Sequence, residues 1–234
     1  MSYMTQRHKK PEKIYPLEEA NDRLLDIFHN HGFTDYPHEK RQQLAQFYQL
    51  LMTRQKTDNF TRLIKFRDIA IKHFIDCLMI PRLTDLQFPL LDIGSGPGFP
   101  GIPLKIEFPD ERIILAEGVK KRVDFLKVVR EEMHLQNLDI VGRNVDENFV
   151  LPVQGAITRA VADMSITLRQ ISKALQVGGV MYFMKGPNVD EELLLTKAQW
   201  RPYFELIQDT AYTLPNTQNQ RRLICWRKVQ EVPQ

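Results

Sequence analysis

The sequence predicts an α/β protein with a mainly parallel, doubly wound sheet that follows an amino-terminal helical segment. From residue 88 onward, short β-rich runs alternate with amphipathic helical stretches, and this alternation requires crossover connections between parallel strands. Residues 1–85 repeat apolar positions at helical spacing without a strand-like run. We therefore expect a helical cap over residues 1–85 and an α/β domain over residues 86–234.

The cap segment contains two clear helical patterns. Residues 17–30 and 37–55 both place apolar side chains three and four positions apart, and the turn HGFTDYPH separates them.

The α/β segment contains seven β-rich runs. Their ranges are 88–94, 112–117, 138–142, 155–160, 180–185, 203–210 and 221–227. The last two runs are joined by LPNTQNQ without an intervening helix, which favours a hairpin. One antiparallel strand is therefore expected, at an edge of the sheet or inserted into it.

Composition is ordinary for a globular protein. The chain has 234 residues, 43% hydrophobic content and a formal net charge of +3, which permits a local nucleic-acid-binding patch without requiring one. Cys77 and Cys225 lack metal-like spacing and are expected to be buried thiols in a reducing compartment. Without a secretory signal or a long apolar run, the sequence predicts a cytoplasmic protein that needs no membrane.

A glycine-rich turn follows the first β-rich run. In LLDIGSGPGFPG, the residues Gly94, Gly96 and Gly98 allow positive φ angles and close approach of a ligand to the backbone. In doubly wound folds, the turn after the first strand binds nucleotides. Ser95 and Phe99 belong to the same turn and are included in the candidate site.

The acid before this turn distinguishes between nucleotide ligands. A dinucleotide site favours three glycines spaced G-x-G-x-x-G, and a Walker loop needs a Lys followed by Ser or Thr. Asp92 would repel a pyrophosphate, but it suits the α-amino group and sulfonium of S-adenosyl-L-methionine, directly or through water. S-adenosylmethionine is therefore the expected cofactor.

Two further acids follow the next two strands. Glu117 ends the second β-rich run, where it could accept hydrogen bonds from both ribose hydroxyls. Asp146 follows the third, where it could accept the adenine amino group while backbone NH groups next to it, including that of Val145, meet the ring. The alternative is that these are three solvated acids on loops.

Several motifs resemble one bacterial family. LLDIGSGPGFPGIPLKI is followed by KKRVDFL, LQNLDIV, TRAVADM and MKG, with DNFT and HFIDC in the cap and QRRLICWRK near the end. Over about residues 33–227, this pattern resembles the 16S (small-subunit) ribosomal RNA guanine-N7 methyltransferases, also called glucose-inhibited division protein B.

The resemblance implies a class I S-adenosylmethionine-dependent methyltransferase with a Rossmann-like, mainly parallel seven-stranded sheet. The methyl acceptor would be the N7 of one guanine in 16S rRNA, within the 30S ribosomal subunit. Arg159 and Lys185 match the family's basic residues at the ends of the fourth and fifth strands. Both would border methyl transfer as catalytic residues, and Arg159 would also contact the cofactor. Nothing in the sequence requires more than a monomer.

The chain departs from the family pattern beside the expected cofactor site. Gly118 stands where the family usually has Ser, and Asn144 stands where it has Arg. These departures keep open the methylation of another RNA or of a small molecule. A non-catalytic RNA-binding module is a further alternative, and the presence of Asp92, Glu117, Arg159 and Lys185 argues against it.

The chemistry of guanine N7 needs neither a general base nor a metal, because this nitrogen carries a lone pair and no proton. Orientation of the reactants is then the main catalytic device. The sequence shows no zinc-like spacing, so no metal site is expected. His73 and Asp76 lie one helical turn apart, either as a structural hydrogen-bonded pair or at the border of the site.

Three basic clusters are candidates for RNA contact. They are residues 6–10, 120–122 and 220–228, and each could instead be a solvated face.

Overall fold

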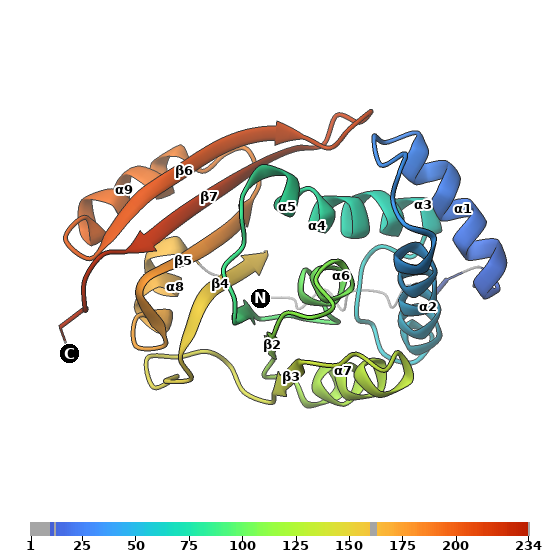
Figure 1. Ribbon diagram of the computed structural model, residues 1–234, viewed down its shortest axis with the longest axis horizontal. Helices are drawn as coiled ribbons and strands as arrows, with labels where there is room; N and C mark the ends of the chain where they lie inside the picture. The colour runs from blue at the N-terminus through green and yellow to red at the C-terminus, as the bar shows by residue number, and fades with distance from the viewer. Residues whose placement is uncertain (1–9, 12, 160–162, 234) are drawn as a thin grey trace, which may run out of the picture.

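The seven expected strands form one twisted sheet. The computed structural model describes residues 10–11, 13–159 and 163–233, and orders the strands β3-β2-β1-β4-β5-β7-β6 (Figure 1). The strand bounds are β1 Leu90–Ile93, β2 Ile113–Ala116, β3 Leu138–Val141, β4 Val153–Arg159, β5 Leu175–Lys185, β6 Phe204–Thr213 and β7 Gln220–Lys228. All seven runs that the sequence predicted are present.

One strand runs against the others. β1 to β5 pair in parallel, whereas β7 lies antiparallel between β5 and β6. The expected antiparallel strand is thus inserted into the sheet, and β6 forms its edge. The hairpin connection explains the arrangement, because the short 214–219 segment cannot carry a crossover.

The cap is helical, as predicted. It contains α1 Leu17–His29 and α2 His38–Gln55, followed by a helical run of α3 Phe66–Ile69, η1 Ala70–Ile75, α4 Asp76–Leu78 and α5 Ile80–Leu83. The element η1 is a π-helical turn. Such wide turns inside helices are frequent at functional sites, because they change the direction of the side chains that follow.

The remaining helices alternate with strands. They are α6 Gly101–Glu107, α7 Lys120–Glu132, α8 Met164–Ile171 and α9 Asp190–Trp200. The helices α6 and α7 join the first three strands, and the connection from β3 to β4 contains turns but no helix in residues 142–152, all of which the structure describes.

Two apolar clusters cover the two faces of the sheet. One contains side chains of α6 and α7 together with the cap, and its fully buried members include Phe47 and Phe74. The other contains α8 and α9, with Trp200 and Trp226 among its members. The first cluster joins the cap to the sheet, while the division of the chain after residue 85 stays a prediction.

The two cysteines are free and buried, as expected from their apolar surroundings. Across the described residues, no helix combines the length and apolar character that crossing a bilayer requires.

Close packing of α6 on the sheet depends on Gly101. A Cβ at this position would overlap the side chain of Leu115 and lie 2.7 Å from Oδ2 of Asp92. We expect Gly101→Ala to lower the free energy of unfolding, because overpacking costs about 1–3 kcal/mol and exceeds the helix-propensity gain of up to about 1 kcal/mol. Gly142→Ala is the control, since its Cβ would lie at an ordinary 3.5 Å from Val123. Equal urea midpoints for the two variants would contradict this role of Gly101.

Candidate active site

The glycine turn at the carboxyl end of β1 exposes its backbone. Gly94, Gly96 and Gly98 have φ angles of 67°, 59° and 112°, all in the left-handed region that favours glycine. A Cβ on Gly96 would meet nothing nearer than the Gly94 carbonyl oxygen at 4.0 Å, so this residue faces open space. The backbone NH of Ser95 donates to the Ala116 carbonyl of β2 at 3.1 Å. The turn is thus anchored on one side and accessible on the other.

Asp92 lies beneath this turn rather than beside it. Its side chain is fully buried, and Oδ2 accepts a hydrogen bond of 2.9 Å from the NH of Gly101. The other oxygen, Oδ1, is buried without a hydrogen-bond partner among the described residues. Burial raises the pKa of Asp92 to about 7, while the NH of Gly101, the nearby hydroxyl of Ser95 and the charge of Arg159 oppose the shift. A buried acceptor without a partner is uncommon in native proteins and points to a ligand or an ordered water.

Glu117 connects the turns after β1 and β2. It is 4% exposed, and its two carboxylate oxygens accept hydrogen bonds of 2.8 Å from the NH groups of Gly96 and Val119. Nη1 of Arg122 lies 3.5 Å from Oε2. The acid predicted to hold a ribose is therefore next to the glycine turn, with its position fixed by two backbone donors.

The loop after β3 completes this edge of the sheet. Val145 is buried, while the exposed Asp146 accepts hydrogen bonds from Arg143 Nη2 at 2.7 Å and from the NH of Asn148 at 2.9 Å. Of the three acids, only Asp146 is solvated, so the alternative of three solvated loop acids is wrong for Asp92 and Glu117.

The two departures from the family pattern contact one another. A Cβ on Gly118 would overlap the side-chain amide of Asn144. The glycine after β2 thus makes room for the asparagine after β3, and the two changes form one local rearrangement.

Arg159, at the end of β4, is held by the cap. Its Nη2 lies 3.0 Å from Nδ1 of His73, and its Nη1 donates to the Lys72 carbonyl at 3.2 Å. The guanidinium carbon lies 5.2 Å from the ring centroid of Phe99, and this ring stacks on His73 with centroids 4.3 Å apart. Phe99 is only 4% exposed and also packs on Phe47, so it shapes the turn from inside the core.

Asp76 links Arg159 to β7. Its carboxylate lies 3.6 Å from Arg159 Nη1 and 3.1 Å from Arg221 Nε, and the side chain is 4% exposed. One buried carboxylate between two guanidiniums is a strongly constrained arrangement, because removing it would leave two cations with less compensation.

His73 borders the site and does not pair with Asp76 in the described structure. Its Nε2 lies 3.1 Å from Oγ1 of Thr61, and its Nδ1 faces Arg159. Burial, reinforced by the Arg159 guanidinium, lowers the pKa of His73 well below its ordinary value. A neutral ring that accepts from the arginine at Nδ1 must donate from Nε2 to the threonine. The alternative of a structural His73–Asp76 pair is wrong.

Lys185 ends β5, the strand next to β4, and is held by an acid of α9. Its Nζ donates to Oε1 of Glu192 at 2.8 Å, and the same oxygen accepts the NH of Met164 at 2.6 Å. Because Arg159 pairs with Met184 in register, the two predicted catalytic cations lie on adjacent strands at the same edge of the sheet.

The predicted RNA clusters have different environments. Lys228 is 1% exposed and donates to carbonyl groups at 2.7 and 2.9 Å, so burial excludes it from RNA contact. Arg221 and Arg222 of the same cluster pair with acids. Lys121 of the second cluster lies 3.9 Å from Asp58. Residues 6–9 of the first cluster lie outside the described residues.

A family model provides the deciding comparison. Residues 40–224 match the model of GidB, described as rRNA small subunit methyltransferase G. The chain belongs to this family. Membership makes it an S-adenosylmethionine-dependent methyltransferase and confirms the resemblance read from the motifs.

Curated members of the GidB family cover most of the chain. A "Ribosomal RNA small subunit methyltransferase G 2" of Bdellovibrio bacteriovorus is 59% identical over 97% of this chain and 89% of its own length. A "Ribosomal RNA small subunit methyltransferase G" of Carboxydothermus hydrogenoformans is 34% identical over 84% of this chain and 86% of its own.

Solved structures support the fold class. TYW2 of M. jannaschii in complex with AdoMet aligns with a TM-score of 0.50 at 14% identity, covering 67% of this chain and 75% of that one. A methyltransferase of Pyrococcus furiosus aligns with a TM-score of 0.51 at 12% identity, covering 65% of this chain and 81% of that one. At such identities the likeness concerns the fold alone, and it confirms the class I methyltransferase architecture.

The site features fit the cofactor of this family. The unpartnered Oδ1 of Asp92, the open face of Gly96 and the carboxylate of Glu117 lie around one turn. Together they offer acceptors for a cationic group and for hydroxyls, and a backbone that a ligand can approach closely. No group of three or more metal-ligating acids, histidines or cysteines occurs in the part of the chain that the structure describes.

Sequence reasoning missed several supporting residues. Thr61, Gly101 and Glu192 hold His73, Asp92 and Lys185, respectively, and Arg221 shares Asp76 with Arg159. The contacts of Thr61, Gly101 and Glu192 span only 12, 9 and 7 residues, but they cross turns between elements, where no spacing rule predicts a contact. Arg221 and Asp76 lie 145 residues apart, and a single sequence does not display such a pair.

The raised pKa of Asp92 predicts pH-dependent cofactor binding. The pKa is about 7 in the free protein, so lowering the pH below 7 protonates the carboxyl that would attract the cofactor's cationic groups. We expect the affinity for S-adenosylmethionine to fall by up to about tenfold per pH unit below about pH 7. Calorimetry from about pH 7 to about pH 5.5 measures this slope. Asp92→Asn should bind weakly and without the slope, whereas Asp139→Asn, at an exposed pair with Arg112, should retain it. A flat wild-type profile would contradict the prediction.

The contact between Asp76 and Arg159 predicts that Asp76 positions the Arg159 guanidinium. We expect Asp76→Asn to lower kcat for methyl transfer by about 10- to 100-fold, because a misplaced guanidinium weakens substrate orientation. The dissociation constant for S-adenosylmethionine should change little. Asp209→Asn is the matched control, since its partner Arg222 keeps a second acid, Asp190, at 2.8 Å. An Asp76→Asn enzyme with normal kcat would show that Arg159 needs no such anchor.

Proposed function

We propose that this protein methylates the N7 of a specific guanine in 16S rRNA, with the 30S subunit or a precursor of it as substrate. The 59% identity to a ribosomal RNA small subunit methyltransferase G, over 97% of the chain, is the observation that carries the proposal. We further propose that the protein acts as a monomer in the cytoplasm.

The cofactor residues divide by the part of the molecule they would meet. Gly94, Ser95, Gly96 and Gly98 would surround its amino-acid portion, and Asp92 would supply negative charge beneath them. Glu117 would accept hydrogen bonds from the ribose hydroxyls. It could do so with its remaining lone pairs, or by giving up the hydrogen bond that it accepts from the Gly96 NH. Val145 and Asp146 would meet the adenine, and Phe99 would support the turn from the core. The bound cofactor supplies an electrophilic methyl group next to a cationic sulfur.

Arg159 and Lys185 would hold the guanine and its phosphate while leaving N7 free. Guanine O6 is a hydrogen-bond acceptor adjacent to N7, and either cation can donate to it. Because the methylated base becomes cationic, a positive group stacked over the ring would oppose the reaction. The anchors of these cations, Asp76 and Glu192, would keep them at the base edge. Alignment in a water-poor site is then the principal source of rate enhancement.

The contact between Asn144 and Gly118 favours one other candidate function. These residues replace the usual Arg and Ser of the family beside the expected adenine position. A methyltransferase of the same fold that acts on another RNA or on a small molecule is therefore the second candidate.

Transfer of labelled methyl groups decides between these functions. The protein is incubated with labelled S-adenosylmethionine and 30S subunits that lack the modification, and cleavable N7-methylguanine is then mapped in the rRNA. A single labelled guanine in 16S rRNA is the expected result. Label that appears only in another RNA or a small molecule would refute the proposal and favour the second candidate.

Separate substitutions test the proposed division of roles. We expect Arg159→Ala and Lys185→Ala to reduce methyl transfer by at least about 100-fold, because correct orientation of the base is lost. Their affinity for S-adenosylmethionine, measured by calorimetry, should remain within a few-fold of wild type, whereas Asp92→Ala should weaken it. Lys173→Ala, an exposed change at the amino end of β5, is the control for loss of positive charge. Equal loss of cofactor affinity in the first three variants would contradict the division.

A further inference from the structure

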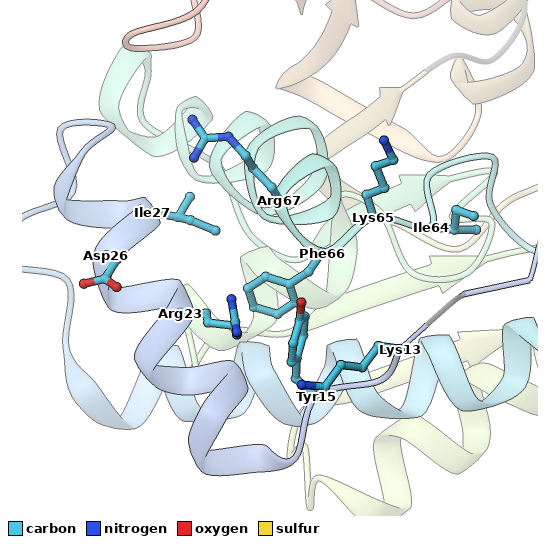
Figure 2. A pocket seen from close by; sticks show the side chains of 9 residues that line it. All are labelled: Lys13, Tyr15, Arg23, Asp26, Ile27, Ile64, Lys65, Phe66 and Arg67. Carbon is cyan, nitrogen blue, oxygen red and sulfur yellow. The ribbon is translucent and has the colours of Figure 1, made fainter.

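The cap contains a cavity that the proposed site does not use. Its volume is about 450 Å³, and it is lined by Lys13, Tyr15, Arg23, Asp26, Ile27, Ile64, Lys65, Phe66 and Arg67. The lining residues come from three segments: the stretch before α1, the second half of α1 and the entry to α3. Figure 2 shows Arg23, Tyr15 and Phe66 close together, while Lys65 and Arg67 extend away from the two rings. Four of the nine lining residues are basic and one is acidic, so the cavity carries excess positive charge.

Two of the four basic residues already have acidic and aromatic partners. Lys13 and Arg23 lie 3.3 and 2.9 Å from the same oxygen of Glu19. Both cations also lie over the ring of Tyr15, at 4.6 and 4.1 Å from its centroid. The rings of Tyr15 and Phe66 pack edge to face with centroids 5.2 Å apart. These contacts build one wall of the cavity. Two cations already lie over the Tyr15 ring and Phe66 is buried, so the rings offer little open face to a base.

The other two basic residues, Lys65 and Arg67, belong to a cationic segment. Residues 56–67 contain four basic and one acidic residue, a net charge of +3 that equals the charge of the whole chain. The acid, Asp58, is taken by Arg54 at 2.7 Å. Among the described residues, Lys65 and Arg67 are exposed and have no acidic side chain within ion-pair distance. Their charge is available to an anionic ligand.

The position of the cavity connects it to the methyl-transfer site. Arg67 lies in the first turn of the helical run that continues into η1, where Lys72 and His73 contact Arg159. His73 follows Arg67 by six positions, a rise of at most about 9 Å. This distance is of the order of one or two nucleotides along an RNA strand, since successive phosphates are several ångströms apart.

We propose that this cavity binds the phosphodiester backbone of the substrate RNA next to the target guanine, with Lys65 and Arg67 as the phosphate ligands. The inference rests on the proposed function, because it assumes an RNA substrate. Three observations favour a backbone phosphate over a stacked base. Lys65 and Arg67 have no acidic partners among the described residues, the nearby rings are largely covered, and the helical run to the Arg159 contacts is short. The site would fix the register of the strand and carry no sequence preference.

Salt-dependent binding tests the two ligands directly. Lys65→Gln/Arg67→Gln removes two positive charges from the cavity. Each lost phosphate contact reduces the slope of log K against log salt by about 0.7–0.9, so the slope should decrease by about 1.4–1.8. At about 0.1 M salt, this corresponds to an affinity for unmodified 30S subunits that is about 25- to 60-fold weaker. The affinity for S-adenosylmethionine should remain that of wild type.

The control variant is Lys173→Gln/Arg201→Gln, which removes the same two charges from exposed positions near the amino ends of β5 and β6. It should keep the wild-type slope, and its affinity should lie within about twofold of wild type, because charges far from the bound RNA are screened by salt. Thermal unfolding of both variants checks that the cap remains folded. Equal losses in the two variants, or an unchanged slope in the cavity variant, would overturn the proposal.

Failure of the proposed function gives a different result. If the wild-type protein neither binds nor methylates 30S subunits, the RNA assignment itself is wrong. If the wild type methylates 30S subunits and Lys65→Gln/Arg67→Gln binds them as well as wild type, only the cavity assignment is wrong.

Discussion

Two buried carboxylates determine the geometry on which the candidate site depends. Asp92 accepts the Gly101 NH at the start of α6, and Glu117 accepts the Gly96 NH in the turn between β1 and this helix. Each acid therefore fixes one end of the same glycine-rich connection. Burial makes both carboxylates costly unless backbone donors or a ligand compensate them. The unpartnered Oδ1 of Asp92 shows that the protein alone does not complete this compensation in the described structure.

The cap contributes side chains to the candidate site as well as covering one face of the sheet. The π-helical turn η1 presents His73 and the Lys72 carbonyl to Arg159, and Asp76 adds a carboxylate shared with Arg221. An arginine side chain carries substantial rotamer entropy, so several partners are needed to hold it in one orientation. These partners come from the cap, whose position on the sheet is maintained by the apolar cluster that the two share.

The sequence predicted the framework of this protein better than its buried contacts. All seven strands and the glycine turn follow from local patterns, since alternation and glycine spacing reflect backbone geometry directly. The burial of Asp92 and Lys228, and the partner of His73, were not predictable in this way. These features depend on contacts between segments that are far apart in the sequence. His73 and Arg159, for example, are 86 residues apart. The motif resemblance located Arg159 and Lys185, whereas only the structure shows that each has an acidic anchor.

Gly118 and Asn144 show that two departures from a family pattern can be related through one packing contact. Viewed separately, loss of a serine and loss of an arginine each weaken the expected cofactor site. In the structure, the asparagine amide occupies the space that a side chain at position 118 would need. A side chain at position 118 would therefore clash with Asn144, and overpacking of this kind is destabilising in tightly packed regions. The glycine and the asparagine are thus compatible neighbours in the loops after β2 and β3, and the loss of the serine follows from the same packing as the presence of the asparagine.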